Sequence, residues 1–189
     1  MAKKITIRPA TLDDARALAY IIRITWIYTY KGVVPDEVLL ARTSLSNFND
    51  SVKRWEESLR KAATDAAKVY RVAEDENGEV VGFTCGGTLD TPELKTDKEL
   101  AGLYVHPAVH SSGAGKALMF EFARLMKAQG AATFGVGCLT GNKIGMGFYK
   151  HMGGKPVFEI PCERLGGVPE TYFEYDISEF LKNTEEKRR

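Results

Sequence analysis

The order of apolar and polar residues along the chain predicts strands and helices that follow one another. Apolar and polar residues alternate over residues 4–8, a period of two that is typical of a strand with one buried face. From Leu12 onward, apolar residues recur every third or fourth position, which predicts an amphipathic helix that continues to about Thr29. Thr11 and Asp14 have the spacing of a capping box, so we expect the helix to begin there.

The same two periods divide the rest of the chain into further elements. The expected helices lie at 36–41, 52–67, 118–130, from 142 onward and at 178–182, with a polar break over 44–50. The expected strands lie at 68–74, 79–89, 100–105, 131–139, 155–160 and 170–177. Residues 75–78 have the composition of a hairpin turn between the first two of these strands.

The most informative stretch runs from Glu99 to Gly130, where a strand leads through a polar glycine loop into an amphipathic helix. The first N–H groups of a helix have no partner within the helix and carry a partial positive charge. Gly113 and Gly115 let an anion approach the backbone, and Lys116 adds a point charge. The stretch predicts a phosphate-binding turn; the alternative is an ordinary strand-to-helix turn whose glycines serve steric fit.

Two common phosphate-binding motifs do not fit this loop. A P-loop requires glycine at position 110 and serine or threonine at position 117, where this chain has His110 and Ala117. A dinucleotide-binding fingerprint requires a third glycine at position 118, where this chain has Leu118. The loop therefore belongs to another class of anion site.

The loop resembles the motif Gln/Arg-x-x-Gly-x-Gly/Ala of the GNAT superfamily of acyl-CoA-dependent N-acyltransferases. It matches that motif at Gly113 and Gly115 and departs from it at His110. A second segment, from Asn142 to Gly154, is similar to the family's Asn-x-x-x-x-x-Phe-Tyr-x-x-x-Gly-Phe, with Gly154 in place of the last residue. The pair of motifs, with a strand between them, extends the resemblance over residues 5–177.

The resemblance implies an α/β (α+β) fold with a mixed central sheet of about six to seven strands. Strands 4 and 5 of that sheet would splay into a V and open a cleft for acetyl-CoA. We expect one domain over residues 1–182 and a charged tail over 183–189. The cofactor-binding residues that the resemblance implies are Leu103, Tyr104, Val105, His110, Ser111, Ser112, Gly113, Ala114, Gly115, Lys116, Asn142 and Tyr149.

The resemblance also implies direct transfer of an acetyl group to a primary amine in a ternary complex, without an acyl-cysteine. Tyr149 matches the family's tyrosine that faces the cofactor sulfur, and we expect its neighbour Phe148 to point into the core. Glu99 lies where some members place a glutamate base, the alternative being ordered water. The departure at His110 favours a second interpretation, a catalytically weak module that binds acyl-CoA as a sensor or interaction domain.

The acceptor is not defined by the sequence. Trp26, Tyr28 and Tyr30 form an aromatic cluster in a region that commonly lines the acceptor side in this family, the alternative being that Trp26 belongs to the core. The alternatives for the acceptor are an antibiotic, a polyamine, an amino acid and a protein N-terminus. Family members are often dimers, so a homodimer is a further expectation.

Composition narrows the class of protein. The 189 residues suit one domain, and 44% hydrophobic with 27% charged residues is typical of a soluble globular protein. A net charge of +1 gives no general attraction to nucleic acid or to an anionic membrane. No apolar run is long enough for a membrane span or a signal peptide. The 3 cysteines are far apart, which predicts reduced thiols, no metal site and a cytoplasmic protein.

Overall fold

The computed structural model describes residues 4–186 and contains two four-stranded sheets. The first has the order β1-β2-β3-β5 and is antiparallel throughout. The second has the order β4-β6-β8-β7, in which only the β4–β6 pair is parallel. The strands are β1 (Thr6–Pro9), β2 (Val69–Glu74), β3 (Val80–Gly86), β4 (Lys98–Glu99), β5 (Gly102–Val105), β6 (Thr133–Leu139), β7 (Lys155–Cys162) and β8 (Val168–Asp176).

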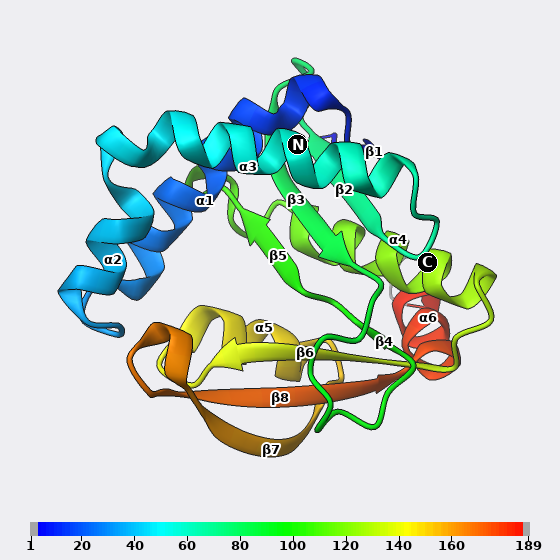
Figure 1. Ribbon diagram of the computed structural model, residues 1–189. Helices are drawn as coiled ribbons and strands as arrows, with labels where there is room; N and C mark the ends of the chain where they lie inside the picture. Colours follow the sequence, from blue (N-terminus) through cyan, green and yellow to red (C-terminus); the bar gives the residue numbers. More distant parts are fainter. Residues whose placement is uncertain (1–3, 187–189) are drawn as a thin grey trace.

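Helices cover the sheets on several faces (Figure 1). In the first sheet, α1 and α3 pack on one face and α4 packs against β1, β2, β3 and β5. In the second sheet, α5 contacts β6, while α6 contacts both β8 and α4 and thereby ties the two sheets together. The helices are α1 (Ala15–Tyr30), α2 (Asp36–Thr43), α3 (Phe48–Ala63), α4 (Ala114–Ala128), α5 (Lys143–His151) and α6 (Ile177–Glu186).

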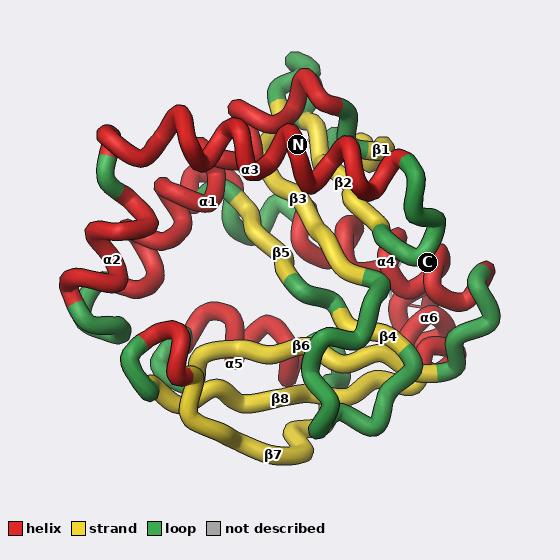
Figure 2. Tube along the Cα trace, viewed as in Figure 1, coloured by secondary structure: helices red, strands yellow, loops and turns green. Residues whose placement is uncertain are grey.

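The expected strand at 100–105 is two short strands that belong to different sheets. β4 pairs in parallel with β6, and the N–H of Leu100 still donates to the carbonyl of Gly135 at 2.8 Å. After Ala101 the backbone turns to β3, where Gly102 pairs with Cys85. Figure 2 shows the loop that separates the two strands and, beyond it, β5 diverging from β6. This divergence is the expected V-shaped splay, here formed between two sheets rather than within one.

The apolar core follows this division. One cluster lies between α4, the second sheet and α6, and is built around the fully buried rings of Phe122, Phe134 and Phe173. A second cluster lies between α1, α3 and the first sheet, around Leu18 and Phe83. The two largest clusters therefore lie mainly on different sheets, and a smaller cluster around Ala73 and Leu118 lies between α4 and the first sheet.

Several expected boundaries are wrong. α3 begins at Phe48 and ends at Ala63, whereas we expected 52–67, because the polar residues before it form a short 3-10 turn that leads into the helix. α6 continues to Glu186, so residues 183–186 are helical rather than part of a tail, and Thr184 is buried. The rest of the expected tail, 187–189, lies outside the described residues.

Two predicted helix ends are confirmed in atomic detail. Gly130 has φ of 85°, and the N–H groups of Gly130 and Ala131 donate to the carbonyls of Lys127 and Met126, a Schellman ending to α4. At the other end of the chain, the Asp14 carboxylate accepts a hydrogen bond of 2.7 Å from the Thr11 N–H, as the capping box predicts. Asp14 also accepts two hydrogen bonds from Arg8 on β1, at 2.7 and 2.8 Å.

Asp14→Asn should destabilise the protein by about 2 kcal/mol, because a carboxylate that is 5% exposed loses charge-assisted bonds to Arg8 and Thr11. Burial raises the pKa of Asp14, but the Arg8 and Thr11 hydrogen bonds outweigh it and lower the pKa below its usual value. The stabilisation is therefore present above about pH 4 and is lost as the pH falls further.

Urea unfolding of both proteins at several pH values measures this difference. Asp13→Asn, a change at the exposed neighbouring carboxylate, is the matched control and should leave stability nearly unchanged. A gap between wild type and Asp14→Asn that persists undiminished at pH 2 would contradict the prediction.

Candidate active site

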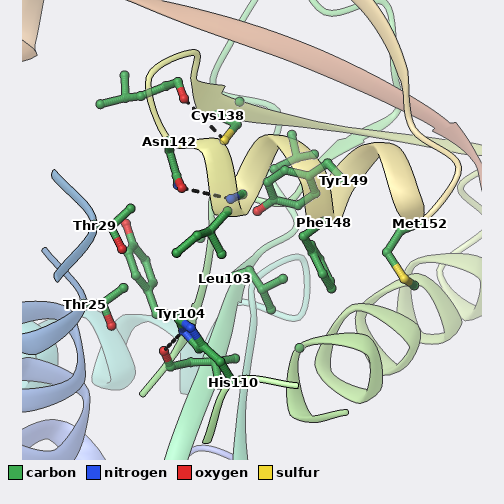
Figure 3. A pocket seen from close by; sticks show the side chains of 18 of the residues that line it. Thr25, Thr29, Leu103, Tyr104, His110, Cys138, Asn142, Phe148, Tyr149 and Met152 are labelled. Atoms are coloured by element: carbon green, nitrogen blue, oxygen red, sulfur yellow. Dashed lines mark hydrogen bonds between the residues drawn. The ribbon is translucent and has the colours of Figure 1, made fainter. Parts of the chain in front are cut away.

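A cavity of about 730 Å³ lies between β5 and β6, where the two sheets part. Its lining comes from α1, α2, β5, the loop before α4, β6, α5, the 163–165 turn, the start of β8 and α6. Figure 3 shows side chains from α1, β5 and α5 converging on it. Because β5 pairs with β3 on one side, its other edge faces the cavity.

The glycine loop forms one end of the cavity. Gly113 is the N-cap of α4 with φ of 89°, in the left-handed region, and open space surrounds the position of a Cβ there. Ser111 also has a positive φ, 64°, so the backbone of this loop is in the left-handed region at two nearly adjacent positions. Among the residues predicted to bind the cofactor, those of this loop that line the cavity are His110, Ser111, Gly113, Ala114, Gly115 and Lys116.

The remaining side chains of the loop hold its shape. Ser112 does not line the cavity; its hydroxyl accepts a hydrogen bond of 3.3 Å from the Ala114 N–H. Nε2 of His110 lies 3.2 Å from the carbonyl oxygen of Val105, which accepts a hydrogen bond when that nitrogen carries the proton. His110 therefore fastens the loop to the end of β5, a role for the residue that departs from the expected motif.

Tyr149 and Asn142 both line the cavity from α5 and its N-cap, on one side of the helix as their spacing predicts (Figure 3). The Tyr149 hydroxyl makes no hydrogen bond to any residue that the structure describes, although the side chain is only 7% exposed. Burial raises the pKa of Tyr149 well above 10, and the nearby Cys138 thiol acts in the same direction. Tyr149 is therefore a neutral phenol with a free proton to donate.

Asn142 has a structural role as well. Its Oδ1 accepts a hydrogen bond of 2.9 Å from the Gly145 N–H and so caps α5, while its Nδ2 donates to the Tyr30 hydroxyl at 3.3 Å. The expectation that Phe148 points into the core is wrong in part. Phe148 is half-buried and lines the cavity, with its ring edge 3.4 Å from the position of a Cβ on Gly115.

Aromatic and aliphatic residues line a further part of the cavity, named the far end below. Trp26 and Tyr30 of α1 line the cavity, with ring centroids 4.6 Å apart, and pack with Leu139 and Leu165 in one cluster. The alternative interpretation of Trp26 as a core residue is also correct, since it is 4% exposed. Tyr28, the third residue of the expected acceptor wall, is 59% exposed, does not line the cavity, and meets His110 edge-on.

The geometry contradicts Glu99 as a general base. Its side chain does not line the cavity and is 8% exposed. Its carboxylate accepts three hydrogen bonds from the preceding loop: the Asp90 N–H at 3.0 Å, the Thr91 N–H at 2.9 Å and the Thr91 hydroxyl at 3.1 Å. Glu99 therefore fixes that loop against β4, and its carboxylate is directed at the loop rather than at the cavity.

The carboxylate that does line the cavity is that of Glu170, at the start of β8. It is 9% exposed and accepts a hydrogen bond of 3.1 Å from the Tyr172 hydroxyl. A Cβ on Gly137 of the paired strand would lie 2.7 Å from its Oε1, so the glycine provides room for the carboxylate. The available sequence signal was an acidic residue at the start of a strand that is otherwise rich in buried aromatic residues.

A family model for the acetyltransferase (GNAT) family matches residues 38–153, more than half of the chain. The chain belongs to the GNAT family. The match spans the splayed strands, the glycine loop and α5.

A curated relative of this GNAT protein is the uncharacterized N-acetyltransferase YuaI of Bacillus subtilis (strain 168). The two are 29% identical over 126 residues, which cover 67% of this chain and 66% of YuaI, just under two thirds of its length.

Solved structures share the fold. The PaiA N-acetyltransferase of Thermoplasma acidophilum, in complex with coenzyme A, is 20% identical with a TM-score of 0.74, covering 92% of this chain and 99% of PaiA. The yncA protein of Salmonella typhimurium, a putative acetyltransferase with its cofactor acetyl-CoA, is 17% identical with a TM-score of 0.66, covering 92% of this chain and 94% of yncA.

The cavity of this GNAT domain also contains a thiol. Cys138 lines the cavity, but burial raises the pKa of its thiol to about 12, so it is a poor nucleophile at neutral pH.

The described residues contain no group of three side chains that would hold a metal ion. No helix within residues 4–186 is long and apolar enough to cross a membrane.

Proposed function

We propose that this GNAT protein transfers an acetyl group from acetyl-CoA directly to a primary amine. One observation carries the proposal: a single cavity joins an anion-binding helix start, an unpaired strand edge and a neutral tyrosine hydroxyl without an internal partner. These are the three features that a bound thioester with a pyrophosphate tail requires. The coenzyme A and acetyl-CoA in the similar structures support the same donor.

In this proposal the pyrophosphate lies against the N–H groups that follow Ala114 in the first turn of α4, with Lys116 close by; the N–H of Ala114 itself is bonded to Ser112. The pantetheine arm extends along the free edge of β5, where the backbone of Leu103, Tyr104 and Val105 supplies hydrogen bonds. An N–H near Val105 polarises the thioester carbonyl. The thioester then lies between β5 and the Tyr149 hydroxyl on α5, the two walls of the cavity.

The reaction requires the attacking nitrogen to lose protons and the leaving sulfur to gain one. Glu170 accepts a proton from the incoming ammonium, and the free amine attacks the thioester carbonyl to form a C–N bond. The C–S bond then breaks, and the thiolate takes its proton from Tyr149. The nitrogen loses its second proton, which restores Tyr149, and Glu170 returns its own proton to solvent. The products are an amide, a free thiol and one proton.

Gly113→Asp should lower the affinity for acetyl-CoA by at least about tenfold, because it places a carboxylate where the pyrophosphate binds. Isothermal titration calorimetry measures the change. Gly113→Asn is the matched control, since asparagine has nearly the same shape and tolerates a positive φ but carries no charge. Equal affinities in Gly113→Asp and Gly113→Asn would remove the argument for an anion site.

Tyr149→Phe should lower kcat by about 100-fold, a typical contribution of general acid catalysis, with little change in acetyl-CoA affinity. The substitution removes no hydrogen bond between described residues, so folding should be unaffected. Because the pKa of Tyr149 lies well above 10, wild-type activity should not fall between pH 8 and pH 10 through loss of this proton. Release of free coenzyme A measures the rate. Parallel losses in kcat and in affinity would instead make Tyr149 a binding residue.

Glu170→Gln should lower kcat/KM by about 100-fold near neutral pH, and the loss should shrink as the pH rises, because more of the acceptor is then already deprotonated. Glu99→Gln is the matched control: it removes a buried carboxylate outside the cavity, so it should affect stability rather than the pH profile. The dependence of kcat/KM on pH, measured for wild type and both variants, tests this prediction. A Glu170→Gln profile parallel to that of wild type would show that Glu170 accepts no proton.

A further inference from the structure

Two arginine side chains line the far end of the cavity, where Arg42 lies over Trp26 and Arg164 contacts Cys162 of the same apolar cluster. Arg42 comes from α2 and Arg164 from the turn between β7 and β8, so different parts of the chain supply them. Neither guanidinium has a carboxylate oxygen within 4.0 Å among residues 4–186. Two guanidinium groups without a counter-charge at one wall of a cavity are an arrangement that attracts an anion.

The contacts that these arginines do make leave their donors free. Arg42 stacks on the Trp26 ring, with its central carbon 4.5 Å from the ring centroid. Stacking uses the face of the guanidinium, and the N–H groups around its edge remain available. Arg164 donates one hydrogen bond, from Nε to the Cys162 sulfur at 3.5 Å, a weak acceptor. Each contact therefore orients a guanidinium without neutralising it.

The same end of the cavity holds the opposite charge. The Glu170 carboxylate lines it at the start of β8, next to the turn that carries Arg164. The contact with Cys162 raises the pKa of Arg164 against the opposing effect of burial, and the charge of Glu170 is a smaller contribution in the same direction. The two charges therefore act on each other although they do not form an ion pair. One carboxylate and two guanidiniums in one compartment match a ligand that carries an ammonium and an anion.

We propose that the acceptor is an amino carboxylate, such as a free amino acid, whose ammonium binds at Glu170 and whose carboxylate binds at Arg42 and Arg164. The proposal rests on the acetyl-transfer function above and names its acceptor. A polyamine is disfavoured because it would bring a second positive charge against two arginines. An amine without an anionic group would make no use of the two guanidiniums, which as exposed groups would stay hydrated.

Matched pairs of acceptors test the proposal. Each common amino acid and its C-terminal amide are supplied with acetyl-CoA to the full-length protein, with spermidine as a further acceptor, and acetylated products are measured by mass spectrometry. The amine of an amide is less basic than that of the free acid, so intrinsic reactivity at neutral pH favours the amide. We expect kcat/KM for the best amino acid to exceed that of its amide by at least about tenfold, the effect of one charge-assisted pair.

Substitutions of the two arginines test whether these residues cause the preference for the amino acid over its amide. Arg42→Gln and Arg164→Gln should each reduce the acid-to-amide ratio by about tenfold through a higher KM for the acid, with kcat/KM for the amide unchanged. Arg164→Lys should restore part of the ratio, because it keeps the charge but not the fork. Arg60→Gln, on the exposed side of α3, is the control and should leave the ratio unchanged.

The outcomes separate the two proposals. Turnover of amides or of spermidine at equal or higher efficiency than amino acids would overturn the amino carboxylate acceptor and leave acetyl transfer intact. Arginine variants that lower the efficiency for acid and amide equally would overturn the assignment of the anion site. Absence of any acetylated product, with acetyl-CoA bound, would overturn the proposed function itself.

Discussion

The structure depends on one change of hydrogen-bond partner in the backbone. Up to Leu100 the chain is bonded to β6 of the second sheet, and from Gly102 it is bonded to β3 of the first. β3 and β6 lie on opposite edges of this segment, and past Leu100 the described backbone makes no further hydrogen bond to β6, so the two sheets part at this point. The free edge of β5 and the cavity both follow from that parting. The glycine loop then begins within a few residues of the parting, which places an anion site at one end of the opening.

The cavity lining is charged in two places. One is the helix start with Lys116, and the other is the group formed by Arg42, Arg164 and Glu170. Between them the lining is neutral: the phenol of Tyr149 and the thiol of Cys138 both keep their protons because burial disfavours their charged forms. A neutral middle section suits a thioester, which has no charge until its carbonyl is attacked.

Local sequence patterns predicted the features that arise from interactions between residues close together in the chain. The glycine at the end of α4, the capping box at Asp14 and the turn at Gly113 each depend on a few neighbouring residues. The roles of Glu99 and Glu170 depend on contacts across the fold, and there the sequence was a poor guide. Glu99 has the right position along the chain, but the loop at 90–91 folds over its carboxylate. Glu170 pairs with Leu139 across β6 and β8, and its carboxylate lies over the glycine at position 137, a register that no local pattern reveals.

The far end of the cavity is built from pieces that come late and early in the chain. Trp26 and Tyr30 precede residue 38, and Arg164 and Glu170 follow residue 153, the limits of the segment that the family model matches. The glycine loop, the parted strands and Tyr149 all lie within those limits. Arg42 is the exception, because it belongs to the far end but lies inside the matched segment. Substitutions in the flanking segments can reshape the far end while the central segment, which bears the strand exchange and the helix start, keeps its geometry.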